Sequence, residues 1–151
     1  MFTQTVEYAL RAMVQLASQS PGACTTKQIA SKTKVPGAYL AKVLQSMRRA
    51  GLVNSRRGVG GGVNLARPAA RISLLDVIDA VEPLKRSGSR SHKGGATLAP
   101  LQRQLNAALD QVRKNLAGIS LGELVKMPVK KKARGGKKKV KRAKSAKKRP
   151  K

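Results

Sequence analysis

The chain has 151 residues, of which 33 are Lys or Arg and only six are Asp or Glu, so its formal net charge of +27 predicts a polyanionic partner, with nucleic acid first. Aromatic residues make up 2% of the chain, which argues against modules that stack single-stranded bases on aromatic rings. A single cysteine excludes an internal disulfide and a cysteine-rich zinc module, and no apolar run reaches the ~20 residues of a membrane helix.

The first quarter of the chain predicts two helices. Apolar residues recur at helical spacing over 5–18, and the Pro-Gly pair at 21–22 ends that helix. Thr25 and Gln28 have the spacing of a capping box, in which each side chain hydrogen-bonds a free backbone N–H group at a helix start. We therefore expect a short second helix that runs to about residue 34.

A third helix and a β-hairpin follow. The tight turn at 35–37 leads into a helix predicted over 38–50, and Gly51 occupies the left-handed position that follows a helix. The segments 52–56 and 63–66 are predicted strands, joined by a glycine-rich turn as in a hairpin. The order helix, short helix, turn, helix and hairpin predicts a winged helix-turn-helix.

Two more capping boxes occur in the second half of the chain. Ser73 and Asp76 open a helix that Glu82-Pro83 closes, and Ser120 and Glu123 open a short last helix. A Ser-, Gly- and Arg-rich stretch follows the first of these helices and predicts a loop.

A long helix predicted over 97–117 carries one apolar stripe. Its members follow at spacings of three and four and therefore share one face: Leu98, Leu101, Leu105, Leu109, Val112 and Leu116. A long helix with little else to bury this stripe predicts dimerisation, and burial within the monomer is the alternative.

The charge is not uniform along the chain. Fifteen of the 33 basic residues and none of the acids lie within 126–151, which predicts a disordered basic tail. The predicted fold class is mainly α. It comprises a winged helix-turn-helix domain over 1–83, a flexible loop over 84–96, the dimerisation helix and closing helix over 97–126, and the Lys- and Arg-rich tail over 127–151.

The outer face of the third helix and the hairpin tip are the predicted DNA-binding surface. They offer hydrogen-bond donors, no acid and small residues, which let the backbone approach DNA closely, and arginine at such a tip suits a narrow minor groove. The predicted DNA-binding residues are Thr26, Lys27, Ala38, Tyr39, Lys42, Gln45, Arg49, Arg56 and Arg57. The alternatives are that Tyr39 only covers the turn and that Lys42 and Gln45 are ordinary solvated residues.

Over residues 1 to about 125 the chain resembles the Rrf2 family of bacterial regulators. The resemblance rests on segments that occur in order: Glu7-Tyr8-Ala9-Leu10-Arg11-Ala12-Met13, Gln28-Ile29-Ala30, Tyr39-Leu40 with Leu44, Arg48-Arg49-Ala50-Gly51-Leu52-Val53-Asn54-Ser55-Arg56-Arg57-Gly58, Gly60-Gly61-Gly62, Leu65-Ala66-Arg67-Pro68, Asp76-Val77-Ile78-Asp79-Ala80-Val81-Glu82 and Ile119-Ser120-Leu121-Gly122-Glu123-Leu124-Val125. It implies a homodimer through the long helix, a palindromic operator, and control of transcription, with repression the expected sign.

The sequence departs from this family in two places. Many members hold an iron–sulfur cluster on three cysteines before the long helix, whereas the stretch 82–101 has no cysteine and only His92 as a potential metal ligand. Because such clusters need several thiolates, we expect no cluster and no other cofactor or metal, and we expect Cys24 to be inert. Ala41 replaces a glutamate of many relatives, which predicts weaker discrimination and higher general affinity for DNA.

The sequence predicts a binding protein and not an enzyme, because no Ser/His/Asp, Cys/His or carboxylate pair is placed for catalysis. We expect it to bind double-stranded DNA in the cytoplasm, at the bacterial nucleoid and without membrane contact, since the chain begins without a secretory leader. The alternative function is a nucleoid-associated architectural protein, because the tail resembles those of linker histones. The sequence identifies no small-molecule effector, and RNA or acidic protein is the alternative partner of the tail.

Overall fold

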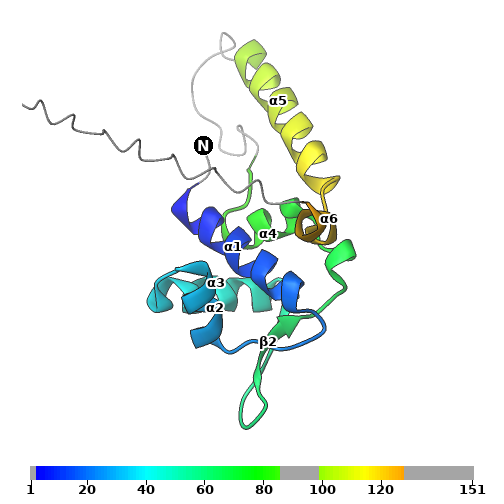
Figure 1. The fold of residues 1–151 in the computed structure, drawn as a ribbon. Coiled ribbons are helices and arrows are strands. Elements are labelled where there is room, and N and C mark those ends of the chain that lie inside the picture. Colours follow the sequence, from blue (N-terminus) through cyan, green and yellow to red (C-terminus); the bar gives the residue numbers. More distant parts are fainter. Residues whose placement is uncertain (1–2, 86–98, 128–151) are drawn as a thin grey trace, which may run out of the picture.

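The computed structural model describes residues 3–85 and 99–127. The elements are α1 (Gln4–Gln19), α2 (Thr26–Thr33), α3 (Gly37–Arg49), β1 (Val53–Arg56), β2 (Gly62–Leu65), the 3-10 helix η1 (Ala69–Arg71), α4 (Leu74–Val81), α5 (Ala99–Ala117) and α6 (Leu121–Lys126). The helices α1 to α4, η1 and α6 pack together as a helical head. Figure 1 shows the β-hairpin of β1 and β2 projecting from one end of this head and the long helix α5 projecting from the other. The predicted mainly α fold with a winged helix-turn-helix is confirmed.

Three expectations concern residues outside the described ranges. These are the predicted loop from residue 86 onward, Leu98 of the predicted stripe, and the predicted tail from residue 128 onward. Among the described residues, no helix combines the length and the apolar character that crossing a membrane requires.

α1 lies at the centre of the head. Thr3 caps its first turn, where the hydroxyl accepts a hydrogen bond from the backbone N–H of Val6. The buried face of α1 is formed by Val6, Ala9, Ala12, Met13, Leu16 and Ala17. These residues recur at helical spacing, so α2, α3, α4 and α6 can pack around one apolar face of α1.

The helix-turn-helix consists of α2 and α3. The predicted capping box is present, with the backbone N–H of Thr25 donating to Gln28 Oε1 at 2.9 Å and the backbone N–H of Gln28 donating to Thr25 Oγ1 at 3.2 Å. Lys34 ends α2 in the left-handed conformation with φ of 56°. α3 buries Leu40, Val43, Leu44 and Met47 against the head, and this leaves its opposite face exposed.

The hairpin is attached to the head through an unpredicted backbone pairing. β1 and β2 are antiparallel, with Val53 opposite Leu65. Cys24, in the connection between α1 and α2, exchanges two backbone hydrogen bonds with Val63 at 2.9 and 2.7 Å. The backbone of β2 comes so close to this connection that a Cβ on Gly62 would lie 2.9 Å from the carbonyl oxygen of Cys24, which only glycine avoids.

α6 is part of the head although it follows α5 in the chain. The amide of Leu74 donates to the carbonyl of Ile119 and the amide of Leu121 donates to that of Ile72, both at 2.9 Å. Leu121 is fully buried in the core. Both remaining capping boxes, at Ser73 and Ser120, are present as predicted.

α5 differs from the other α-helices in that none of its residues is buried. It projects away from the head in Figure 1. Three members of the predicted stripe, Leu101, Leu105 and Val112, are exposed by 55%, 52% and 45%, while Leu109 and Leu116 are half-buried. The monomer therefore leaves much of this apolar stripe in solvent, which is unfavourable unless another surface covers it.

Candidate nucleic-acid interface

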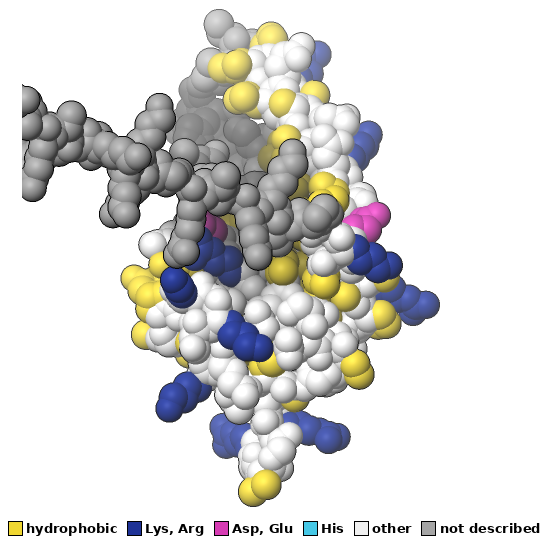
Figure 2. Space-filling model, viewed as in Figure 1, with side chains coloured by type: hydrophobic (Ala, Val, Ile, Leu, Met, Phe, Trp, Pro, Cys, Tyr) yellow, Lys and Arg dark blue, Asp and Glu magenta, His cyan; other side chains and the backbone are white. Residues whose placement is uncertain are grey.

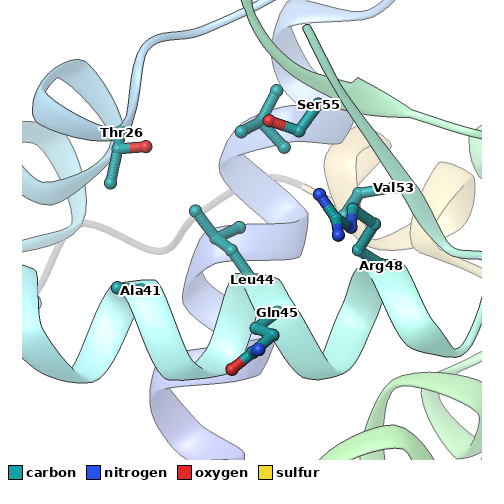
Figure 3. A pocket seen from close by; sticks show the side chains of 8 residues that line it. Thr26, Ala41, Leu44, Gln45, Arg48, Val53 and Ser55 are labelled. Carbon is teal, nitrogen blue, oxygen red and sulfur yellow. The ribbon is translucent and has the colours of Figure 1, made fainter. Parts of the chain in front are cut away.

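A hollow of about 280 Å³ lies between the exposed face of α3 and the hairpin. Figure 3 shows Thr26, from the start of α2, and Ser55, from β1, facing α3 across it. The lining residues are Thr26, Ala41, Leu44, Gln45, Arg48, Val53, Ser55 and Val63. The hollow therefore joins α2, α3 and the hairpin in one surface.

The chemistry of the hollow suits a polyanion. Leu44, Val53 and Val63 are buried and form an apolar floor, while the other lining residues are exposed. Two hydroxyls, an amide and a guanidinium surround that floor. These groups donate hydrogen bonds to phosphate oxygens, and the amide and guanidinium can also pair with base edges.

All nine predicted DNA-binding residues are exposed in the structure. Ala38, Lys42, Gln45 and Arg49 follow the helical period along one side of α3, as expected. Thr26 and Gln45 line the hollow itself. Lys27 instead lies with the outer residues of α2, beside Thr25, Gln28, Ser31 and Lys32.

Tyr39 lies on the other flank of α3, away from the hollow. Its ring meets the ring of Tyr8 edge to face, with centroids 5.9 Å apart and the planes at 62°. The same side of α3 borders Thr5 and Val81, so Tyr39 covers the junction of α1, α3 and α4. It remains 53% exposed, so the packing role does not remove it from the surface.

The tip of the hairpin is narrow and carries two basic residues. Arg56 and Arg57 are exposed, and Val59 is fully exposed at the tip. A Cβ on Gly61 would lie 2.5 Å from the carbonyl oxygen of Arg56, so the tight turn requires glycine there. Figure 2 shows basic side chains on both sides of this end of the molecule and a hydrophobic group at its extremity.

The interface contains no acidic residue. All six acids of the chain lie outside the stretch 8–75, in or beside α1, α4, α5 and α6. Several are engaged locally: Glu7 pairs with Arg11, while Asp76 and Glu123 cap helices. Figure 2 likewise shows acidic side chains only well away from the hairpin. The positive potential of α3 and the hairpin is therefore not offset by nearby negative charge.

Two polar residues of the hollow, Arg48 and Ser55, were not among the predicted site residues. Arg48 stands three and seven positions after Gln45 and Ala41, so the helical period alone could have placed it beside them. Ser55 alternates with the buried Val53 on β1, but its direction toward α3 depends on how the hairpin is attached at Val63. A local sequence pattern could therefore have identified Arg48 as a site residue, but not Ser55.

The arrangement of three helices, hairpin and basic interface defines a winged helix-turn-helix protein. The Rrf2 family, described as "Iron-dependent Transcriptional regulator", matches residues 2–127. The chain is 42% identical over 81 residues to an inferred HTH-type transcriptional regulator of Synechocystis sp., which covers 53% of this chain and 55% of that protein. The chain therefore aligns with about half the length of this relative.

Solved structures with the same fold include CymR proteins of two bacteria and an IscR protein. CymR, "the Global Cysteine Regulator of B. subtilis", superposes with a TM-score of 0.69 at 27% identity, over 83% of this chain and 96% of CymR. IscR of T. potens gives a TM-score of 0.69 at 27% identity, over 83% and 86%. The oxidised form of Staphylococcus aureus CymR gives 0.67 at 30% identity, over 85% and 98%.

The chain belongs to the Rrf2 family. The family match spans the head, α5 and α6, so the resemblance inferred from the sequence motifs is confirmed. It is a transcriptional regulator of the Rrf2 type, and the prediction that it is not an enzyme is confirmed by the same match.

The family description names iron, but the residues of this chain do not fit an iron–sulfur cluster. Its one cysteine, Cys24, is buried at 5% exposure in the joint between hairpin and head. Protein iron–sulfur clusters are held by several thiolates. Within residues 3–85 and 99–127, no group of three or more His, Cys, Asp and Glu side chains is placed to hold a metal ion. We therefore assign no step to such a cluster.

Proposed function

We propose that the protein is a sequence-specific repressor that binds a palindromic DNA operator as a homodimer. The observation that carries this proposal is the acid-free surface of α3 and the hairpin, with Gln45 and Arg48 beside a hollow of about 280 Å³. In winged helix-turn-helix proteins the second helix of the motif enters the major groove, and a wing contacts a neighbouring part of the duplex. α3 is the reading element, and Arg56 and Arg57 contact the backbone or minor groove.

The exposed stripe of α5 supports a homodimer. Leu101, Leu105 and Val112 lie on one face and stay largely in solvent in the monomer. A twofold dimer would bury the stripe of one protomer against that of its partner, and a twofold protein matches a palindromic site. The other predicted members of this interface are Leu109 and Leu116, with Leu98 outside the described residues.

The basic tail is proposed to add affinity without sequence choice. Residues 126–151 contain 15 of the 33 basic residues. Each phosphate that a basic side chain neutralises releases condensed counterions, which lowers the slope of log affinity against log salt by about 0.9. Deletion of residues 127–151 should therefore weaken binding to random duplexes and flatten that slope, and an unchanged slope would overturn this role of the tail.

We infer that the protein works without an iron–sulfur cluster or other bound cofactor, since one cysteine cannot supply a thiolate set. We propose double-stranded DNA as the partner and the bacterial cytoplasm, at the nucleoid, as the location.

Selection of bound genomic DNA fragments tests the proposed function. The full-length protein should enrich a few sites that contain two inverted half-sites, and the Gln45→Ala variant should lose that enrichment. Lys114→Gln, at an exposed position on α5, is the control and should enrich the same sites as the wild-type protein. Uniform recovery of fragments by the wild-type protein would contradict sequence-specific regulation.

A nucleoid-associated architectural role is the second candidate. It is favoured by one observation, the density of basic residues in 126–151, because such a tail binds any duplex. The same selection separates the two functions, since an architectural protein recovers fragments without a shared motif.

A further inference from the structure

We propose that the ion pair between Asp79 and Arg113 fixes the angle of α5 on the head and thereby sets the half-site spacing that the dimer accepts. This inference rests on the proposed function, because it concerns how two heads are held on one operator. Asp79 and Arg113 are positioning residues, since neither belongs to the surface that we assign to DNA.

The ion pair has the geometry of a clamp. Arg113 Nη2 donates to Asp79 Oδ2 at 2.9 Å, and Nη1 donates to Asp79 Oδ1 at 3.2 Å. Nη1 also donates to the carbonyl oxygen of Leu84 at 2.9 Å, while the amide of Leu84 donates to Asp79 Oδ1 at 3.1 Å. The guanidinium thus binds the carboxylate in two places and the chain beyond α4 in a third.

The clamp is partly shielded from water. The side chains of Arg113 and Asp79 are 32% and 30% exposed. A two-point contact of planar groups restricts rotation more than a single lysine contact does. The pair therefore resists a change in the direction of α5 relative to α4.

The clamp adds to an attachment at the C-terminal end of α5. There, backbone hydrogen bonds join residues 119 and 121 to residues 74 and 72. One attachment at the end of a helix allows the helix to swing, whereas a second, at Arg113, fixes its direction. The part of α5 before Arg113 extends away from the head and has no buried residue (Figure 1).

The clamp and the apolar stripe use different sides of α5. At 3.6 residues per turn, Arg113 lies about 100° around the helix from the centre of the stripe formed by Leu101, Leu105 and Val112. The clamp can therefore persist when a partner covers the stripe. In a dimer built on α5, the direction of each α5 determines where the partner's head lies.

The direction of α5 determines which spacing between two DNA half-sites the dimer can bind. One base pair added between two half-sites moves them apart by about 3.4 Å and rotates one against the other by about 35°. A dimer distinguishes such sites only if the joint between head and α5 is stiff. Asp79 and Arg113 form an ion pair that bridges the head and α5.

The test measures spacing preference with full-length protein. The probes are duplexes that carry the two half-sites selected by the wild-type protein, at the selected spacing and at one or two base pairs more or fewer. Arg113→Ala and Asp79→Ala are compared with Arg103→Ala, which removes an exposed arginine from the same helix. A duplex with one half-site, sedimentation and thermal unfolding report head affinity, dimerisation and stability.

Residues in direct contact commonly couple by an amount that corresponds to roughly 2- to 150-fold in an equilibrium constant. We therefore expect Arg113→Ala to lower the preference for the selected spacing by about tenfold, while single half-site affinity and the dimer remain unchanged. Asp79→Ala should have the same effect, the double variant should add little to either, and Arg103→Ala should behave as wild type. Arg113→Lys should give an intermediate preference, which keeps the test informative if Arg113→Ala is unstable.

The outcomes separate this inference from the function on which it rests. If Arg113→Ala and Arg113→Lys form dimers with the wild-type spacing preference, the clamp does not set spacing and the inference is wrong. If the wild-type protein enriches no paired half-sites at all, the proposed function fails and the inference fails with it.

Discussion

Ala41 lies on the rim of the hollow, one helical turn before Gln45 and in the group that also includes Thr26 and Arg48. Its methyl group leaves this part of the interface without negative charge. Because the nearest functional neighbours are all hydrogen-bond donors, one carboxylate here would change the sign of the local interaction with a phosphate.

We therefore expect Ala41→Glu to weaken binding to random-sequence duplex DNA by roughly fivefold. A unit charge about 4 Å from a phosphate costs about 1 kcal/mol in water-like surroundings, which corresponds to that factor. Fluorescence anisotropy titration measures the effect, and Ala107→Glu on the exposed side of α5 is the matched control. Equal affinities of the two variants would argue against contact between the hollow and DNA.

Single side chains of the interface could be predicted where the helical period alone decides their direction. Lys42, Gln45 and Arg49 are exposed for this reason. Tyr39 is different, because its contact with Tyr8 depends on how α1 crosses α3, which no local pattern contains. Ser55 faces the hollow only because the hairpin is attached at Cys24, which the sequence pattern did not indicate.

Among the elements, the three capping boxes were predictable because each involves residues only three apart. The box that begins α6 also has an electrostatic consequence. Hydrogen bonds from the backbone N–H and then the hydroxyl of Ser120, at 2.9 and 3.1 Å, hold the pKa of Glu123 below its ordinary value, and Lys126 lowers it further. The ionised form of Glu123 is thus favoured in the folded protein.

Glu123→Gln should lower the midpoint of thermal unfolding at neutral pH, and this difference should disappear in acid. Because the folded-state pKa is lowered, the carboxylate stabilises the fold above the ordinary glutamate pKa, and that contribution is lost as pH falls through the folded-state pKa. Thermal unfolding followed by circular dichroism across this range checks the sign. A difference that grows as the pH falls would contradict the assignment.

α6 also illustrates an element whose place in the fold was not predictable. Its helix was expected, but its pairing with the start of α4 joins residues 73 and 120, which are far apart in the chain. The 3-10 helix η1 was likewise missed, since its three residues are too few for a periodic pattern. Sequence patterns therefore left out the long-range pairing of α6 and an element too short to show a period.

Leu121→Ala should lower the free energy of unfolding by about 2–5 kcal/mol, because it removes a fully buried leucine and leaves a cavity between α6 and the head. Val125→Ala, four residues later and 39% exposed, should change it by less than about 1 kcal/mol. Chemical denaturation measures both. Similar losses for the two variants would mean that α6 does not belong to the cooperative core.

At the scale of the whole molecule, the exposed stripe of α5 is the surface that we propose to pair with a second protomer. We expect Leu105→Lys to abolish this proposed dimer, because it places a charge in the middle of the apolar face. Ala107→Lys, on the opposite side of α5, should leave the dimer intact. Sedimentation analysis distinguishes the two, and a dimer that tolerates Leu105→Lys would show that another surface carries the association.

The net charge is a second property of the whole molecule, and it could be predicted from composition. The net charge of +27 indicates the class of partner, and the position of every acid outside 8–75 indicates the side that faces it. Composition could not predict the direction of α5 relative to the DNA-binding side. That direction depends on the ion pair between Asp79 and Arg113, which are far apart in the chain.

The most direct test of DNA reading by α3 is an equilibrium competition at moderate ionic strength between the most strongly selected duplex and random-sequence DNA. For the full-length protein we expect a preference of about 10³-fold or more, as for specific regulators. Gln45→Ala should reduce that preference by roughly tenfold, since a side chain that pairs with a base edge is worth about 1–3 kcal/mol of discrimination. Equal binding of both DNAs by the wild-type protein would contradict this account.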